Sequence, residues 1–294
     1  MPEILSESQI ASYQDTGYLV LDTYLPDKVI NDIKNEISRF EDESCGLTQS
    51  NDRLELEDGH TLDQPRVRRI RLPHKISDMM RELMYSDYIL APARDLIGPN
   101  LRLHTTKLNM KSAGNGAAIE WHQDYAFYPH TNDDILAIGV IIDDMESENG
   151  PLMVYPGSHK GPVFNHHVDG VFAGAFSPTD VGLNPSDAVE LTGPAGSISI
   201  HHGRIVHGSA LNTSNQSRRI LFYEMMAADA FPIMGSMTSW AGIEDYDTRM
   251  LCGNSTLTPR LKDIPIRIPQ PQPDVPVSIY EIQKGLKKRD FSVS

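Results

Sequence analysis

From about residue 101 the sequence breaks into short apolar runs, and this pattern constrains the fold more than any other feature. Two of the runs are ILAIGVIIDDM (135–145) and RRILFYEMMA (218–227). Turn-forming stretches such as SAGNG, ENGP and TGPAG separate them. Many short strands at this spacing are typical of an all-β sandwich or barrel, so we expect a mainly β fold.

The residues before this region have a helical pattern. Ser6 and Gln9 have the spacing of a capping box, and Gly17 ends the first predicted helix. YLVL (18–21) follows as a short strand. Pro26 then fits the first turn of a second helix, whose apolar face repeats every three or four residues up to Phe40. We expect these N-terminal helices to pack on the sheet.

Four further segments complete the pattern. Residues 41–64 are polar and acidic, and we expect a long loop there. RVRRIRL (66–72) predicts a basic strand, which could bind an anionic substrate or face solvent at a sheet edge. Residues 76–98 predict helices. The proline-rich residues 264–277 predict an extended surface segment, followed by a short polar element.

Bulk properties limit the protein class. With 294 residues we expect one domain over 1–294, with a core of about 6–230 and a C-terminal extension of about 231–294. A net charge of −14 argues against binding nucleic acid or anionic membranes. There are two cysteines, no signal-peptide pattern and no membrane-spanning run, which predicts a cytoplasmic protein. We expect a monomer or homodimer.

The motif EWHQDYAFY (120–128) carries the first chemical signal. His122 and Asp124 are two residues apart, so on an extended strand their side chains project from the same face. One imidazole and one carboxylate, with a further histidine, form the facial triad of non-haem Fe(II) oxygenases. The pattern H-x-D alone is common by chance, so the assignment needs a third ligand.

Two histidine-containing stretches offer that ligand and a cosubstrate anchor. HHGRIVHG (201–208) holds three histidines, and Arg218 follows His207 by eleven residues. A hairpin closing over LNTSNQS would bring His207, Ser209 and Arg218 to one face. A guanidinium and a hydroxyl beyond a metal-binding histidine suit the far carboxylate of a dicarboxylate cosubstrate. His201 and His202 alternate on a strand, so at most one of them faces the interior.

The order of these motifs resembles the phytanoyl-CoA dioxygenase family of Fe(II)- and 2-oxoglutarate-dependent oxygenases. The matching pieces run from GYLVL through WHQD and NGPLMVYPGSHKG to AGSISIHHGRIVHGSALNTSNQSRR. The resemblance implies a double-stranded β-helix, a jelly-roll or cupin-like core. It also implies that His122, Asp124 and His207 are the catalytic iron ligands, with Fe(II), 2-oxoglutarate and O2 required for activity.

The resemblance assigns further residues. Arg218 and Ser209 would bind the far carboxylate of 2-oxoglutarate, and Lys107 and Asn109 would line the cosubstrate or substrate pocket. Val140 stands where some family members have a tryptophan, which changes the expected pocket shape.

Other polar and aromatic residues near the motifs have weaker assignments. Strand alternation points Gln123 away from the metal, so a structural hydrogen bond competes with a substrate role. PGSHKG is expected to be a structural turn, and His166 is expected in a substrate lid rather than as a ligand. The candidate substrate-binding residues are Gln123, Tyr125, Phe127 and His167.

The predicted function is hydroxylation of an unactivated C–H bond in a small, anionic metabolite or secondary metabolite, with release of succinate and CO2. A carboxylate at Asp124 argues against halogenation. Oxidative desaturation, rearrangement and hydroxylation of an acyl-CoA stay open as alternatives. The intact triad together with Arg218 argues against a non-catalytic jelly-roll binding protein. A Zn- or Mn-dependent cupin-type hydrolase or isomerase has no use for Arg218 at this position.

Overall fold

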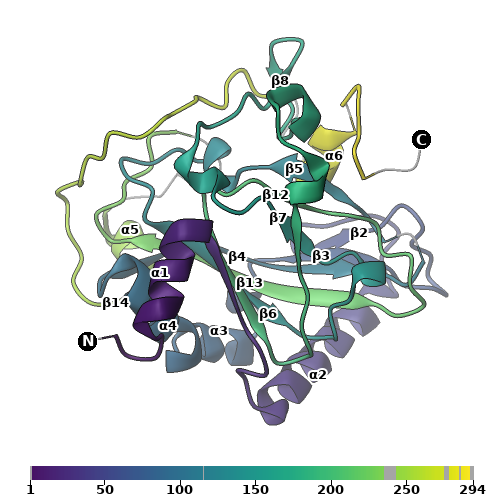
Figure 1. Cartoon of the computed structure of the whole chain (residues 1–294). Helices are drawn as coiled ribbons and strands as arrows, with labels where there is room; N and C mark the ends of the chain where they lie inside the picture. Colours follow the sequence, from purple (N-terminus) through teal and green to yellow (C-terminus); the bar gives the residue numbers. More distant parts are fainter. Residues whose placement is uncertain (1, 115, 235–242, 275–277, 285, 292–294) are drawn as a thin grey trace.

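Two antiparallel sheets face each other in the computed structural model, which describes residues 2–114, 116–234, 243–274, 278–284 and 286–291 (Figure 1). The large sheet follows the order β1 (Tyr18–Leu21), β11 (Ile198–His202), β6 (Ile135–Ile141), β13 (Arg218–Ala227), β4 (Leu101–Lys111), β3 (Val67–Arg71), β2 (Leu54–Leu56), with β14 (Met250–Cys252) also paired to β4. The small sheet has the order β10 (Val189–Leu191), β7 (Leu152–Val154), β12 (His207–Ser209), β5 (Ile119–His122). The predicted mainly β, jelly-roll architecture is confirmed.

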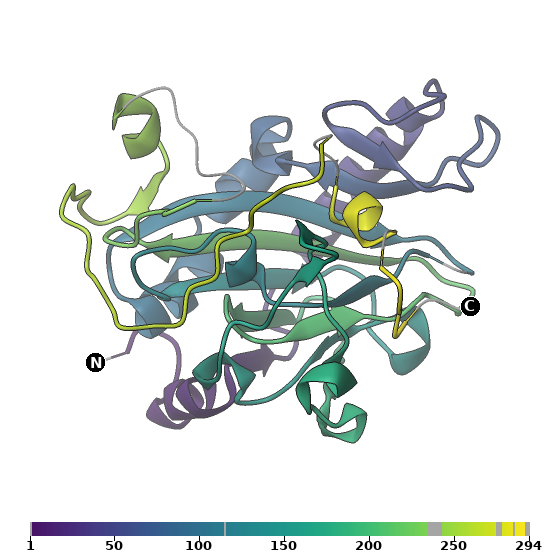
Figure 2. The same cartoon turned by 90° about the horizontal axis from the view of Figure 1, so that it is seen from above.

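Helices cover the outer face of the large sheet, as Figures 1 and 2 show from two directions. The α-helices are α1 (Glu7–Thr16), α2 (Asp27–Ser44), α3 (Asp78–Met84), α4 (Asp87–Ile97), α5 (Ile243–Asp247) and α6 (Ile279–Gln283). Short 3-10 turns and the ribbon β8 (His167–Val168) with β9 (Val171–Phe172) lie between them.

The main core fills the space between α2–α4 and the large sheet. Ile33 and Phe40 of α2 and Leu221 of β13 belong to it and are fully buried. The apolar face of α2 therefore packs against the large sheet, as the spacing of its apolar residues predicts. Because this layer covers one face of the large sheet, the other face is left to form the inside of the barrel against the small sheet.

Local signals at the N-terminus are confirmed. The Ser6 side chain accepts from the Gln9 backbone N–H, and the Gln9 side chain accepts from the Ser6 N–H. Gly17 ends α1 with a left-handed φ of 84°.

Two expectations are wrong. Residues 41–64 are not one loop, because α2 continues to the buried Ser44 and the buried strand β2 follows. The polar residues on both sides of β2 are the reason that the sequence did not predict this strand. RVRRIRL is not an edge strand, because β3 lies between β2 and β4. Within the described residues, no helix has both the length and the apolar character needed to cross a bilayer.

Candidate metal and cosubstrate site

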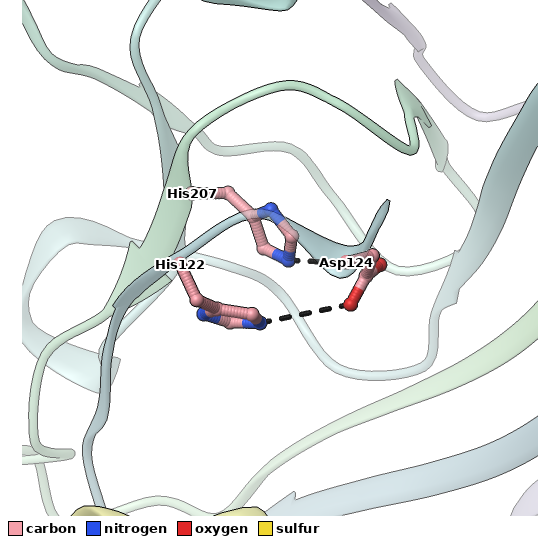
Figure 3. Close-up of side chains that lie close together, drawn as sticks. All are labelled: His122, Asp124 and His207. Carbon is pink, nitrogen blue, oxygen red and sulfur yellow. Dashed lines mark ion pairs between the residues drawn. The ribbon is translucent and has the colours of Figure 1, made fainter. Parts of the chain in front are cut away.

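Three side chains converge inside the barrel, as Figure 3 shows. His122 is the last residue of β5, Asp124 opens the 3-10 turn η2 (Asp124–Ala126), and His207 opens β12. Their ligand atoms all lie within 4.8 Å of one another, and all three residues are buried. The predicted continuous strand through H-x-D is wrong, since the strand ends at His122. Gln123 is still extended, with φ −122° and ψ 124°, and this conformation keeps both side chains on one face.

Hydrogen bonds orient both imidazoles toward the carboxylate. Nδ1 of His122 lies 2.8 Å from the Glu120 carbonyl oxygen, and Nδ1 of His207 lies 3.0 Å from that of Ile205. A carbonyl can only accept, so each Nδ1 carries the proton and each Nε2 presents a lone pair. Those Nε2 atoms are 3.7 Å and 3.8 Å from Asp124 oxygens. These separations are too long for hydrogen bonds, but one ion with bonds of about 2 Å can bridge them.

The protonation states also suit a cation. Burial lowers the pKa of His207 well below its ordinary value, and the neighbouring His122 adds to this, so the imidazole is neutral. Burial alone would raise the pKa of Asp124. The nearby Lys107 and His207, with smaller contributions from the His122 and His201 imidazoles, hold the pKa of this carboxyl well below its ordinary value. Two neutral imidazoles and one carboxylate are the forms that bind metal.

Arg218 reaches the site by a different route from the one predicted. The expected hairpin between the strands of His207 and Arg218 is wrong, because β12 pairs with β5 and β7 while β13 pairs with β4 and β6. The connection crosses from the small sheet to the large one. Both strands still line one cavity, because the two sheets face each other. The sequence correctly predicted that His207 and Arg218 share one site. They do so because the two sheets face each other, not because their strands form a hairpin.

The Arg218 guanidinium is buried at 3% exposure and lines this cavity with Ser209. It donates from Nε and Nη2 to the carbonyl oxygen of Gly150, and it has no carboxylate partner among the described residues. Gly150 has a φ of 72°, and a Cβ there would collide with the Ala210 carbonyl oxygen. Burial lowers the pKa of Arg218 to about 10, so the group stays charged at neutral pH. An unpaired buried guanidinium in a cavity suits a carboxylate ligand.

Lys107 and Asn109 lie on β4 and face the same cavity. The Lys107 ammonium is 2.5 Å from Oε1 of the buried Glu224. Burial would lower the pKa of Lys107, but Glu224 and Asp124 outweigh it and raise the pKa above its ordinary value. The Asn109 side-chain oxygen accepts from Nε of Arg69 at 3.1 Å.

All four candidate substrate-binding residues lie outside the cavity lining, and three of them form hydrogen bonds elsewhere. Gln123 is fully buried and bonds to the backbone of residues 162, 164 and 204. The Tyr125 hydroxyl donates to the His130 carbonyl oxygen at 2.5 Å. His167 lies in the β8–β9 ribbon, 3.0 Å from the Gln270 carbonyl oxygen. These side chains therefore form hydrogen bonds away from the cavity, and for Gln123 the structural hydrogen bond is the alternative that the structure favours.

Phe127, His166 and the PGSHKG turn also lie outside the cavity lining. The Phe127 ring meets His122 edge-on, with centroids 5.8 Å apart, so it flanks a metal-facing residue without lining the cavity. His166 is buried, and its Nε2 accepts from the Gln123 N–H at 3.0 Å. PGSHKG forms the expected turn, with Gly157 at φ 77°.

Several cavity residues were not predicted individually. Arg69 belongs to the basic strand, which did signal an anionic ligand. Ile119, Leu152 and Phe222 form apolar walls and give no signal beyond ordinary strand residues. Ile279 of α6 also lines the cavity, and its distance along the chain from every motif explains why the sequence does not reveal it.

Of the two histidines in the motif that precede His207, His201 faces the cavity and His202 does not. Nε2 of His201 is 3.5 Å from Oδ2 of Asp124. His202 packs instead against Tyr13 and His159 and lies 4.0 Å from Asp133. The alternation predicted for this strand therefore matches the arrangement seen.

Comparison with known proteins identifies the family. Residues 13–220 match the family model described as Phytanoyl-CoA dioxygenase (PhyH). The chain belongs to the phytanoyl-CoA dioxygenase family. This membership, with the relatives below, makes it an Fe(II)- and 2-oxoglutarate-dependent dioxygenase acting with O2 on a small molecule.

Two curated family relatives and one solved structure illustrate the similarity. The "Probable alpha-ketoglutarate-dependent hypophosphite dioxygenase" of Stutzerimonas stutzeri is 35% identical over 96% of this chain and 99% of its own. The L-proline trans-4-hydroxylase of Streptomyces griseoviridis is 33% identical over 53% of this chain and 65% of its own. The crystal structure of EctD from S. alaskensis with 2-oxoglutarate and 5-hydroxyectoine has a TM-score of 0.66 at 23% identity, covering 76% and 77% of the two chains, which supports the fold.

Proposed function

We propose that this enzyme oxidises a small inorganic or organic oxyanion, with hypophosphite as the first candidate substrate. The observation that carries the proposal is the cavity itself, which the cationic side chains of Lys107, Arg69 and Arg218 line together with the triad histidines. The near full-length similarity to the Stutzerimonas stutzeri relative supports the choice of hypophosphite.

His122, Asp124 and His207 bind Fe(II) in this proposal, and Arg218 with Ser209 binds the far carboxylate of 2-oxoglutarate. Bound iron, 2-oxoglutarate and O2 supply an oxidation in which one oxygen atom enters the substrate and the other enters succinate, with loss of CO2. The chain's own residues orient these groups. The Nδ1–carbonyl hydrogen bonds fix the two imidazoles, and the Gly150 carbonyl fixes the Arg218 guanidinium.

The reaction balances for hypophosphite. A P–H bond becomes P–OH, which gives phosphite and, at neutral pH, releases a proton. O2 accepts four electrons, two from the P–H bond and two from 2-oxoglutarate as it becomes succinate and CO2. This step departs from the C–H hydroxylation expected from the sequence only in the atom that is oxidised. The apolar walls at Ile119, Leu152 and Ile279 limit the entry of water near the reacting bond.

Substrate-dependent succinate formation tests the proposal. The enzyme is loaded anaerobically with Fe(II) and 2-oxoglutarate and then exposed to O2 with hypophosphite, L-proline or ectoine. We expect phosphite and succinate to form in a one-to-one ratio, with the phosphite measured by phosphorus NMR. If hypophosphite does not stimulate succinate formation while proline or ectoine does, the hypophosphite assignment is wrong.

Three broader properties belong to the same proposal. We place the enzyme in the cytoplasm, consistent with Cys45 and Cys252, which are both free thiols. The chain acts as a monomer or homodimer, which light scattering coupled to gel filtration measures directly. The single-domain organisation over 1–294 agrees with contacts from α6 to β5, and a single cooperative unfolding transition would support it.

A further inference from the structure

Two polar side chains face the triad without a part in the proposed binding of iron or of the far carboxylate of 2-oxoglutarate. Lys107 comes from β4 and His201 from β11, with β13 and β6 between them in the large sheet. Both line the cavity that contains His122 and His207.

His201 is buried yet lacks hydrogen-bond partners. It is 2% exposed, and neither of its ring nitrogens has a hydrogen-bond partner among the described residues. Nε2 lies 3.5 Å from Oδ2 of Asp124, and the ring packs against His207 with centroids 4.7 Å apart. Leaving a buried polar group unpaired costs free energy, and native proteins rarely do so without a ligand or water at the position.

Lys107 is held by a buried pair of residues. Oε1 of Glu224 is 2.5 Å from the ammonium, and Oε2 of Glu224 accepts from the Tyr128 hydroxyl at 3.0 Å. The Lys107 side chain keeps 23% exposure, whereas that of Glu224 keeps 2%. An ammonium has three N–H donors, so the contact with Glu224 leaves others free to face the cavity. Lys107 lines the same cavity as His122 and His207, so its ammonium faces the space beside the triad.

We infer that Lys107 and His201 together bind the negatively charged oxygens of the substrate beside the metal, with Glu224 and Tyr128 as positioning residues for Lys107. The inference rests on the proposed function, because it names the residues that would receive the oxyanion. It separates Lys107 from cosubstrate binding, a choice that the sequence left open.

The charges of the cavity select a monoanion. Fe(II), the Asp124 carboxylate, dianionic 2-oxoglutarate and the Arg218 guanidinium together are neutral, and Lys107 is balanced by Glu224. Arg69 remains. It has no carboxylate within ion-pair distance among the described residues. Glu55, which lies opposite Arg69 in the β2–β3 register, forms ion pairs with Arg68 and Arg71 instead. One excess positive charge favours a ligand with a single negative charge over a dianion.

Binding to a form that cannot turn over tests this inference separately from catalysis. The enzyme is loaded with Mn(II) and 2-oxoglutarate without O2, and titration calorimetry measures the Kd of hypophosphite, formate and nitrate against the dianions phosphite and sulfate. We expect the monoanions to bind more tightly. Lys107→Met and His201→Phe should each raise the hypophosphite Kd at least tenfold and leave the Kd of 2-oxoglutarate within about twofold.

The chain provides a matched control in Arg71. It lies directly opposite Lys107 in the register of β3 and β4, it pairs with Glu55, and it does not line the cavity. Arg71→Met removes the same charge one strand away, so we expect no change in either Kd beyond twofold. Lys107→Arg should recover part of the lost affinity. Glu224→Gln should raise the KM for substrate more than it lowers kcat, because the Lys107 ammonium is then no longer held in position by a carboxylate.

The outcomes separate the two claims. If hypophosphite is not oxidised but monoanions still bind in a way that depends on Lys107 and His201, the proposed function fails and this inference stands. If hypophosphite is oxidised with unchanged Kd and KM in both variants, the inference is overturned. A rise in the 2-oxoglutarate Kd alone would also overturn it, because Lys107 would then belong to the cosubstrate. Thermal melting of each variant establishes that it is folded, and Lys107→Arg replaces Lys107→Met if the latter is not.

Discussion

At the scale of single residues, Arg218 and its neighbour Arg219 have opposite roles. Arg219 forms a two-point pair with Asp143, at 2.8 Å and 2.7 Å, whereas in the described part of the chain the Arg218 guanidinium bonds only to the carbonyl of Gly150. We expect Arg218→Gln to raise the KM for 2-oxoglutarate by roughly 100-fold, because two charge-assisted hydrogen bonds are lost. Arg219→Gln should leave this KM unchanged. Steady-state kinetics with varied 2-oxoglutarate measures both, and equal effects would contradict the assignment.

Substitution of His122 and substitution of His167 should have different effects on iron binding and activity, because only His122 belongs to the triad. His122→Ala removes one of three metal-facing side chains, so we expect Fe(II) binding and succinate formation to be lost while the fold is retained. His167→Ala changes a histidine in the β8–β9 ribbon, outside the cavity, and should keep wild-type kcat. Iron content after gel filtration and circular dichroism measure the two variants. Full iron content in His122→Ala would contradict the assignment.

The residues that sequence reasoning found are those whose spacing encodes chemistry. H-x-D, the later histidine and Arg218 are recognisable because a metal and a dicarboxylate require those groups in that order. Gln123 and Tyr125 were proposed as substrate ligands from their proximity to H-x-D, yet their side chains bond to backbone away from the cavity. Proximity in sequence does not specify which way a side chain points once a strand ends and a 3-10 turn begins.

At the scale of elements, α6 links the C-terminal residues to the strand that carries His122. The Gln283 side chain accepts from the Glu120 N–H at 2.9 Å and donates to the Gly174 carbonyl oxygen at 3.1 Å. We expect Gln283→Leu to lower the free energy of unfolding by about 1–3 kcal/mol, because two buried backbone groups lose their partners. Chemical denaturation measures the loss. Lys284→Leu, one residue on and at the surface, should change stability by less than about 0.5 kcal/mol.

The arrangement of elements was only partly predictable. Amphipathic spacing and a capping box locate α1 and α2, since these signals are local. The contact between β12 and β5 joins residues far apart in sequence, and no local signal distinguishes it from the hairpin that we expected. The position of α6 against the cavity is likewise set by tertiary packing.

At the scale of the whole molecule, buried neutral histidines make the fold sensitive to acid. Burial lowers the pKa of His74 to about 4, and that of His130 and His202 to about 3, from an ordinary value of 6.5. The unfolded chain therefore binds more protons than the folded one below about pH 6.5, and stability falls as the pH drops from there toward these lower values. At pH 5 each group costs up to about 2 kcal/mol.

Denaturation at pH 7.5 and pH 5 measures this dependence. His74→Asn keeps a polar atom near the place of Nδ1, which lies 2.6 Å from the Thr106 hydroxyl, but does not titrate. We expect the variant to lose less stability than the wild type between the two pH values, by up to about 2 kcal/mol. An identical loss in both proteins would show that His74 titrates normally in the folded state.

The wall that α6 adds to the cavity has a consequence for protein synthesis. Every residue of the triad and the Arg218 anchor leaves the ribosome before Ile279 does, and the family match ends at residue 220. A chain that ends before Ile279 would therefore carry the triad and Arg218 but would lack one apolar wall of the cavity.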